Sequence, residues 1–423
     1  MPNRLLSMAG RMLPMVVGVA LLPRHVAGDE LVPRIDVALG RAGGYLVSAQ
    51  DDDGAWRSKA YASLRGGPAL TPYVLSSLFY LPQTGTSARP SYRRGVEYLV
   101  GFVDENGRIR SDVPEMLYPV YTGTMASRVV PLLDRSPAHL TAQRAFVEFV
   151  RARQLTRSLG WHPDDPEYGG WGFSLVPPRK PRPDEPRDRF LESNLSATLF
   201  GIAALRSADV QAEDSAYQSA LVFVRRCQNF SDDPRRRDPK FDDGGFFFMP
   251  GDMYQNKAGV AGEDRFGRER YHSYGTMTAD GLRALVRCGL KSDHPRVVAA
   301  RRWLEQNFSA TDNPGTWEPD RAVLQNATYY YWAWSISHAF MGLGIEQIET
   351  DDGNVRWAEV LAEELLRRQK DDGSWINQYT DSREDDPLVA VPWAAAALAV
   401  CRYVITGEQR LLGATKRRLE TTQ

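Results

Sequence analysis

Four side chains stand out as candidates for acid–base chemistry: Asp280, His338, Asp385 and Asp386. Asp280 interrupts a largely apolar stretch, residues 277–290, where an unpaired carboxylate would be costly to bury. It either faces a cavity or a loop and takes part in chemistry, or it pairs with an arginine such as Arg283 or Arg287. In both cases we expect a partner or a raised pKa for this carboxyl.

Asp385 and Asp386 close the acidic string 383–386, just before the last apolar helical segment. Clustered carboxyls can keep one proton between them, because like charges disfavour a second ionisation. This position near the start of an apolar helix makes the pair a candidate acid. His338 lies in an aromatic helical segment, where it is either a base or a core histidine with satisfied hydrogen bonds.

Aromatic and polar residues gather near the starts of the apolar helical segments. The candidate ligand-binding residues are Tyr121, Asn194, His272, Tyr274, Tyr330, Tyr331, Trp334 and Trp393. Large rings beside a few polar groups could form a binding pocket in which the polar groups orient the ligand. The alternative is structural: the rings fill the centre of the molecule while Ser and Thr cap helices.

Two kinds of helical segment must position these residues. One kind is apolar nearly all round and is therefore expected to be buried; it covers residues 71–81, 118–133, 193–208, 273–288, 329–344 and 391–405. The other kind is amphipathic, as in residues 356–369. The alternation predicts an inner ring of buried helices inside an outer ring of amphipathic ones. Patterns typical of strands are sparse.

A motif recurs at the end of the amphipathic helices. Its clearest copies join Gln50 to Gly54-Ala55-Trp56 and Gln369 to Gly373-Ser374-Trp375. The marker glycines of all copies, degenerate ones included, are Gly54, Gly107, Gly169, Gly244, Gly315 and Gly373. Acidic residues and Gly after a helix form a stop and a turn. We expect Gln to hydrogen-bond backbone groups of the turn or of the next repeat, and Trp to cover the junction.

The segment 41–56 has the form Arg-Ala-x2-Tyr-Leu followed by Gln-x3-Gly-x-Trp. It resembles the repeats of squalene–hopene and oxidosqualene cyclases, which are related to the repeats of protein prenyltransferase β subunits. The resemblance extends over residues 29–407 and implies an all-α fold, an α/α toroid (α6/α6 barrel) of six helix-pair repeats. In those families the inner helices line a cavity that holds an isoprenoid chain.

The catalytic signatures of both families are missing. No Asp-x-Asp-Asp string, the acid of the cyclases, occurs in the chain. The three cysteines and six histidines form no ligand spacing like that of the prenyltransferase zinc site. We therefore expect no metal and no cofactor, and buried, inert thiols. One toroid also differs from the two barrel domains of the hopene cyclases.

The N-terminus predicts export. Basic residues, an apolar run at 12–22 and small residues at 26–28 are typical of a signal peptide, residues 1–28. The run is too short for a normal membrane-spanning helix, so no stable transmembrane segment is expected. A polar, basic tail is expected at 408–423. The net charge of -1 gives no field that would attract nucleic acid, and the oligomeric state stays undecided.

Three hypotheses of function follow. The first is an exported toroid that binds or transforms a lipophilic, isoprenoid-like small molecule in a central cavity. The second is a non-catalytic interaction scaffold that kept the toroid. The third, by analogy of fold alone, is a carbohydrate-active helical barrel. The sequence leaves open whether the chain is an enzyme.

Overall fold

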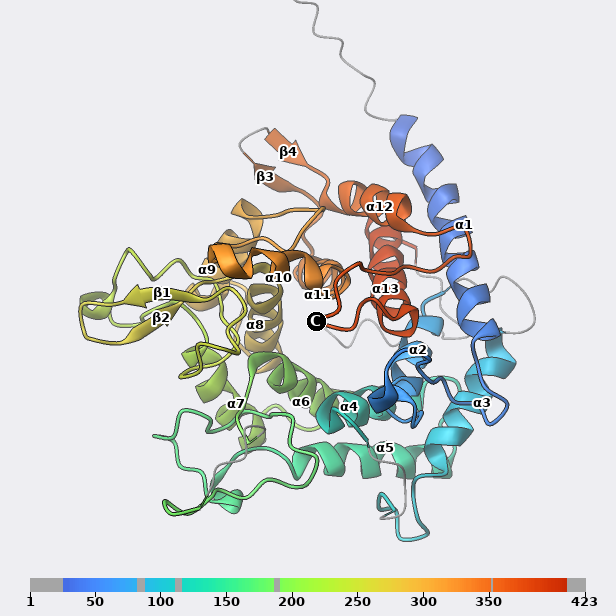
Figure 1. Cartoon of the computed structure of the whole chain (residues 1–423), viewed down its shortest axis with the longest axis horizontal. Coiled ribbons are helices and arrows are strands. Elements are labelled where there is room, and N and C mark those ends of the chain that lie inside the picture. The colour runs from blue at the N-terminus through green and yellow to red at the C-terminus, as the bar shows by residue number, and fades with distance from the viewer. Residues whose placement is uncertain (1–25, 82–87, 111–115, 186–190, 351–352, 409–423) are drawn as a thin grey trace, which may run out of the picture.

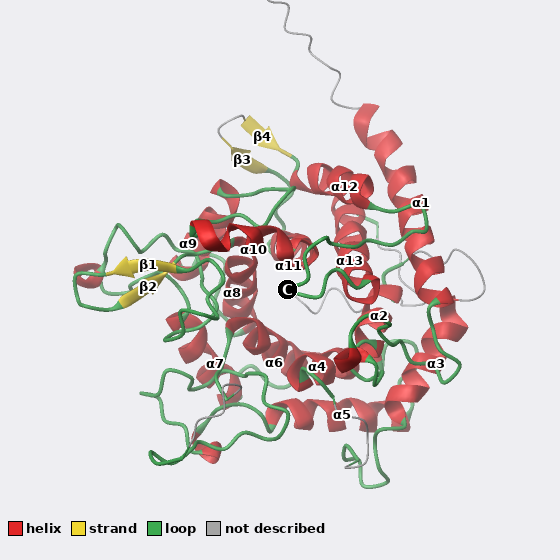
Figure 2. Cartoon of the chain, viewed as in Figure 1, coloured by secondary structure: helices red, strands yellow, loops and turns green. Residues whose placement is uncertain are grey.

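The computed structural model describes residues 26–81, 88–110, 116–185, 191–350 and 353–408, and these are mainly helical. Figures 1 and 2 show the helices as two concentric rings around one axis. The expected signal peptide lies outside the described residues up to position 25, and the expected tail lies outside them from position 409. Export therefore stays a prediction.

The inner ring consists of α2 (Thr71–Leu78), α4 (Pro119–Val129), α6 (Leu195–Ser207), α8 (Gly275–Arg287), α11 (Tyr329–Gly342) and α13 (Pro387–Thr406). The outer ring consists of α1 (Val26–Ser48), α3 (Ala88–Val100), α5 (Pro137–Arg151), α7 (Ser215–Arg226), α9 (Pro295–Gln306) and α12 (Trp357–Arg368). Consecutive inner helices pack against one another, and α13 returns to α2, so the inner ring is closed.

The remaining elements lie in the connections. The short helix α10 (Ala322–Ala327) precedes α11. One antiparallel hairpin pairs β1 (Val260–Glu263) with β2 (Glu269–Tyr271), and a second pairs β3 (Ile348–Thr350) with β4 (Gly353–Val355). These hairpins project from the rim (Figure 1). The helix α13 begins at Pro387, earlier than the expected residue 391, because Asp386 caps it and Pro is well suited to the first helical position.

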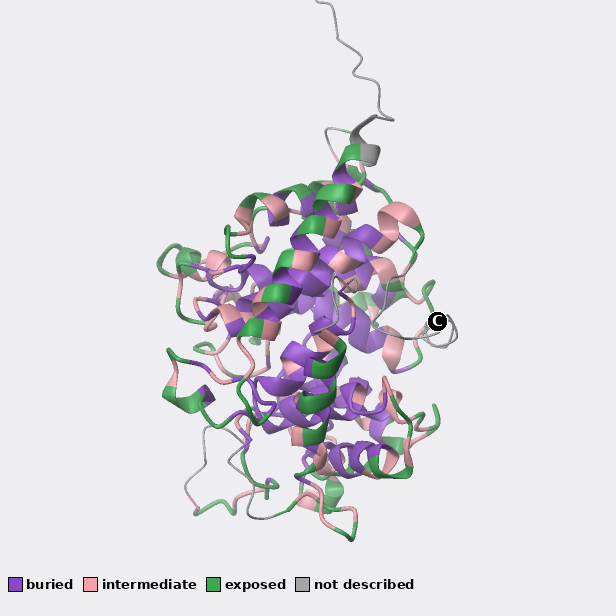
Figure 3. Ribbon diagram, turned by 90° about the vertical axis from the view of Figure 1, so that its right-hand side faces the viewer, coloured by how far each residue is buried: buried purple, intermediate pink, exposed green. Residues whose placement is uncertain are grey.

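Burial follows the two kinds of helical pattern. In α6 every residue from Leu195 to Leu205 is buried, as expected for a helix that is apolar all round. In the outer helix α5 the buried residues alternate with exposed ones at helical spacing. Figure 3 shows the buried residues towards the interior and the exposed ones along the outward faces. Cys227, Cys288 and Cys401 are free and buried, as predicted.

The expected glutamine contacts are confirmed at four junctions. Gln154 Nε2 donates to the carbonyl oxygen of Gly169 at 2.8 Å and to that of Ala216, in the next outer helix, at 2.9 Å. The same double contact joins Gln50 to Gly54 and Ser91, Gln228 to Gly244 and Arg296, and Gln369 to Gly373 and Ala38. Each glutamine therefore ties its own turn to the neighbouring outer helix.

Glycine and tryptophan complete these junctions. Gly169 has φ +91°, and a Cβ there would lie 1.8 Å from the carbonyl oxygen of Ser219, so only Gly fits. Trp171 Nε1 donates to the carbonyl oxygen of Val150 at 2.8 Å, and Trp56 and Trp375 make the matching contact with Leu46 and Leu365. The indole of Trp317, in a degenerate copy, has no such bond.

The first helix closes the ring. Gln369 reaches back to Ala38 in α1. Arg402 of α13 pairs with Asp36 of α1 at 2.6 Å, and Arg34 pairs with Glu363 of α12 at 2.7 Å. The segment directly after the predicted signal peptide is thus part of the ring.

The helix α13 is long and apolar enough to cross a membrane by length and composition. Yet 72% of its most apolar window is buried inside the ring. It packs against α11, α12, α1 and α2. Its apolarity is accounted for by its place in the protein core.

Candidate functional site

The inner helices bring their N-terminal ends to the same side of the ring. Thr124 Oγ1 donates to the carbonyl oxygen of Phe200 at 2.9 Å, and Ser127 contacts Ser207 at 3.2 Å, so α4 and α6 run in the same direction. Arg206 near the end of α6 likewise donates to the carbonyl oxygen at the end of α8. Residues early in each inner helix therefore lie at one level, and residues late in each helix lie at another.

Asp280 is the centre of a buried polar network. Its side chain is fully buried, and Oδ2 accepts a hydrogen bond from the Tyr331 hydroxyl at 2.5 Å. Oδ1 accepts one from Ser335 and lies 3.5 Å from Arg283 Nη1. Since Tyr331 donates its only proton to Asp280, the bond between the Tyr331 and Ser196 hydroxyls must be donated by Ser196. The network joins α6, α8 and α11.

Both outcomes expected for Asp280 occur together. It has an arginine partner, and burial raises the pKa of its carboxyl, an effect that Arg283 and the two hydroxyls oppose. His338 behaves differently. Burial, helped by the charge of Arg283, places the pKa of His338 well below its ordinary value, so its imidazole is neutral at pH 7.

Aromatic rings surround this network. We name them the central aromatic cluster: Tyr73, Tyr121, Phe173, Phe200, Phe248, Tyr331, Trp334 and Trp393. The two indoles, 4.6 Å apart between ring centroids, are only 5% and 8% exposed. Tyr73 meets Trp393 edge-on at 5.1 Å, and Tyr121 lies 4.6 Å from Phe200. The cluster is thus closely packed around its tryptophans.

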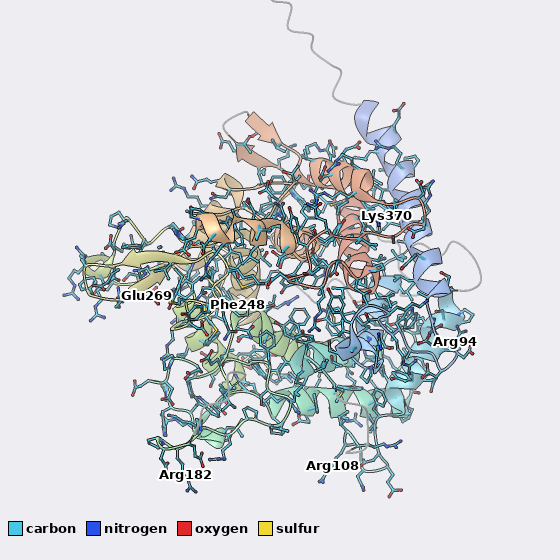
Figure 4. All side chains as sticks on the ribbon, in the orientation of Figure 1. Arg94, Arg108, Arg182, Phe248, Glu269 and Lys370 are labelled. Carbon is cyan, nitrogen blue, oxygen red and sulfur yellow. The ribbon has the colours of Figure 1, made fainter. Side chains whose placement is uncertain are left out.

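One side of the cluster is less covered. Tyr73, Tyr121 and Tyr331 are half-buried, and so are Phe173 and Phe248 from the loops. Figure 4 labels Phe248 on the inner side of the ring, whereas Arg94, Arg108 and Arg182 lie at its outer rim. The open side of the cluster therefore consists of tyrosine and phenylalanine rings.

The structure brings together part of the predicted set. Asp280, Tyr121, Tyr331, Trp334 and Trp393 meet in the network and the cluster described above. His338 joins them, because its ring packs on Trp334 at 4.9 Å and its Nδ1 lies 2.8 Å from that residue's carbonyl oxygen.

The other predicted binding residues have local structural contacts. Asn194 caps α6 by accepting from the Ala197 amide at 2.8 Å. Tyr274 packs on Trp317 at 5.2 Å, and the Tyr330 hydroxyl donates to the carbonyl oxygen of Ile376 at 3.4 Å. His272 is half-buried next to β2, and burial lowers its pKa. None of these four belongs to the central aromatic cluster.

The acidic string also has structural contacts. Asp386 caps α13 by accepting from the Leu388 amide at 2.9 Å and from the Ser58 hydroxyl. Asp385 accepts from the Tyr61 hydroxyl at 2.6 Å. Glu384 is buried and accepts from the amides of Tyr330 and Tyr331 at the start of α11. Burial raises the pKa of Glu384 to about 7. These three carboxyls hold helix starts and a loop in place.

Sequence reasoning missed several members of the site, although a signal existed for some. Ser335 lies four residues after Tyr331 and hence on the same helix face. Phe173 and Phe248 each stand two residues after a marker aromatic, Trp171 and Phe246. In an extended segment, side chains two apart point the same way. For Tyr73 and Phe200 we find no such signal, because their helices are apolar all round.

The site can hold a proton and face a positive charge. A carboxyl with a raised pKa, bonded to a tyrosine hydroxyl, can exchange a proton with a neighbouring group. Indole and phenol faces attract cations. Among the described residues no group of three or more His, Cys, Asp or Glu side chains is placed to hold a metal ion.

Solved structures share this architecture. A type II terpene cyclase, MstE from Scytonema, in complex with its substrate geranylgeranyl dihydroxybenzoate, is 13% identical and matches 89% of this chain and 99% of its own, with a TM-score of 0.51. The GH76A α-1,6-mannanase from Salegentibacter sp. HEL1_6 is 10% identical and matches 88% and 99%, with a TM-score of 0.51. No protein-family model and no curated protein matches the sequence. The likeness is one of fold, an α/α toroid.

Proposed function

We propose that this protein is an exported α/α toroid of six helix-pair repeats that binds a lipophilic, isoprenoid-like molecule at the central aromatic cluster. The observation that carries the proposal is that Asp280 is bonded to Tyr331, whose ring packs on Trp334 at 5.6 Å and on Trp393 at 5.2 Å. Burying an unsaturated hydrocarbon chain against such rings is favourable through lost apolar surface and ring contacts. The half-buried tyrosines are the members that a ligand meets first.

The comparisons support a ligand-binding toroid but do not choose between ligands. A terpene cyclase and a mannanase match with the same TM-score. The arrangement of the carboxyl groups distinguishes a lipid ligand from a sugar. Glycoside hydrolysis ordinarily needs two of them facing the sugar, about 5 to 9.5 Å apart. Here Asp280 is bonded to a ring hydroxyl of the central aromatic cluster, whereas Glu384 binds the Tyr331 backbone amide, Asp386 caps α13 and Asp385 binds Tyr61. Of these four described carboxyls, Asp280 alone is bonded to a ring side chain of the cluster, and this arrangement favours the lipid over a sugar.

Whether the bound molecule is also chemically converted depends on Asp280 acting as an acid. In a proton-initiated cyclisation the protonated form of Asp280, which burial favours over the form paired with Arg283, would give its proton to an alkene carbon. The rings would face the carbocation, and a proton lost from a neighbouring carbon would restore the acid. Product and substrate would then have the same mass. Incubation with C20 and C30 polyprenes, followed by chromatography, tests for such isomers, with Asp280→Asn as the inactive comparison at a temperature where circular dichroism shows that this variant is folded.

Binding is tested by tryptophan fluorescence. Titration with geranylgeraniol, a C20 isoprenoid alcohol, should change the emission of the wild-type protein, and Trp393→Phe should weaken that change. Trp161 provides a matched control, because it is also buried but belongs to a separate peripheral cluster. Trp161→Phe should respond like the wild type. Binding of α-1,6-mannotriose with no response to the polyprenol would overturn the proposal in favour of a carbohydrate.

A further inference from the structure

Three arginines project from the later turns of two inner helices. Arg128 is in the last turn of α4, and Arg287 is in the last turn of α8. Arg283 lies one turn before Arg287 and therefore on the same face of α8. Arg283 is only 7% exposed, and the other two are half-buried. Three cations held partly or largely out of solvent require an explanation, because burying a charge without a counter-charge is costly.

Arg283 lies next to the central aromatic cluster. The Arg283 guanidinium is 4.2 Å from the centre of the Trp334 ring. His338 of α11 packs on the same tryptophan. Since α6 stands between α4 and α8 in the ring, Arg128 and the α8 arginines come from opposite sides of α6. Burial lowers the pKa of Arg283 and of Arg287, and the charge of Arg128 lowers both further. The three charges thus act on one another.

The described residues do not balance this charge. Asp280 pairs with Arg283 and is the acidic side chain that lies beside these arginines. His338 is neutral, and Arg206 of α6 brings a further guanidinium, which donates to the carbonyl oxygen of Arg287. Within the described part of the chain, the guanidinium groups of Arg128 and Arg287 form no ion pair. The partial negative charge at the helix C-termini offsets only part of the repulsion.

We propose that Arg128, Arg283 and Arg287 form a subsite for the anionic head group, a carboxylate or a phosphate, of the molecule that the central aromatic cluster binds. This inference rests on the proposed function and narrows it to amphipathic isoprenoid acids or phosphates. Guanidinium groups present paired N–H donors that match both anions. Because Arg283 stacks on Trp334, the head group and the first part of the chain would contact neighbouring side chains.

The first test compares head groups on the same chain. Calorimetric titration of the full-length protein with geranylgeraniol, geranylgeranoic acid and geranylgeranyl phosphate should give an affinity for the two anions at least about tenfold higher than for the alcohol. Arg128→Gln and Arg287→Gln should each remove most of this preference and leave the affinity for the alcohol unchanged. Arg301→Gln, on the outer helix α9, is the control and should retain it, since Arg301 pairs with Glu305 at the surface.

The second test needs no prenyl compound. Without ligand, Arg287→Gln should raise the melting temperature because it relieves repulsion, and inorganic phosphate should stabilise the wild type more than the variant. If the alcohol and the anions bind equally well, and the variants melt like the wild type, the subsite is refuted while the lipophilic site stands. If inorganic phosphate binds through these arginines and no prenyl compound binds, the proposed function fails, and the arginines are a site for free phosphate.

Discussion

The glutamine junctions permit a quantitative test of what holds the ring together. In Gln154→Ala the carbonyl oxygens of Gly169 and Ala216 each lose their side-chain partner. An unsatisfied buried polar group costs about 1–3 kcal/mol, and the freed side-chain entropy returns about 1.5–2 kcal/mol. For two such groups the balance lies between about 0 and 4 kcal/mol, and we expect a net loss of about 2 kcal/mol in the free energy of unfolding. Gln154 is only 4% exposed, so water cannot readily replace the amide.

Gln50→Ala is the matched comparison. Gln50 Nε2 makes the same two contacts, and its Oε1 also accepts from the Ser91 hydroxyl and from Arg94, but its side chain is half-buried. Water can therefore reach the freed carbonyls, and we expect a loss of about 1 kcal/mol. Gln211→Ala, at an exposed position, should change stability by less than about 0.5 kcal/mol.

The assay is urea denaturation followed by far-ultraviolet circular dichroism. The midpoints should fall in the order Gln211→Ala, Gln50→Ala, Gln154→Ala, with equal slopes. A Gln154→Ala midpoint within error of the wild type would refute the reasoning. So would a Gln50→Ala variant less stable than Gln154→Ala, because burial would then not set the strength of the junction.

Three further predictions concern single residues. Gly169→Ala should lower the free energy of unfolding, measured by chemical denaturation, by more than about 3 kcal/mol, since both the φ of Gly169 and its contact with Ser219 forbid a Cβ. Gly44 in α1 has open space around it, so Gly44→Ala should raise that free energy by about 0.5–1 kcal/mol. Glu384 has a pKa of about 7 in the folded protein and an ordinary value of 4.5. The folded state therefore holds the extra proton between these values, and stability should fall by about 3 kcal/mol as pH rises from 4.5 to 7; Glu384→Gln should flatten this dependence in melting curves. Asp280→Asn should lower the free energy of unfolding by about 3–5 kcal/mol, because it leaves a buried guanidinium without its counter-charge; a variant as stable as the wild type would contradict the assigned ion pair.

The fold could be predicted from the sequence because its signals are local. A helix that is apolar all round must be buried, and a turn of acidic residues and Gly must follow the helix that it ends. The contacts of Gln50 with Gly54 and of Trp56 with Leu46 span only a few residues. The composition and spacing of residues 41–56 therefore already predicted the end of the outer helix and the turn that follows it.

The acidic string shows what local signals leave open. Asp385 and Asp386 lie next to an apolar helix, as a catalytic pair would. The folded chain instead places Asp386 at the N-terminus of α13 and brings Ser58, 328 residues away, against it. A capping aspartate and a catalytic one have the same local sequence, so only the tertiary contacts separate them.

The site itself was decided by the tertiary structure. Asp280 and Tyr331 are 51 residues apart in sequence, and Ser196 and Tyr331 are 135 apart. An amphipathic helix reveals which face is buried, but a helix that is apolar all round, such as α6, carries no such mark. The sequence alone determined that these helices form the inner ring. Only the closure of that ring fixed the rotation of each helix, and with it the side chains that meet at the centre.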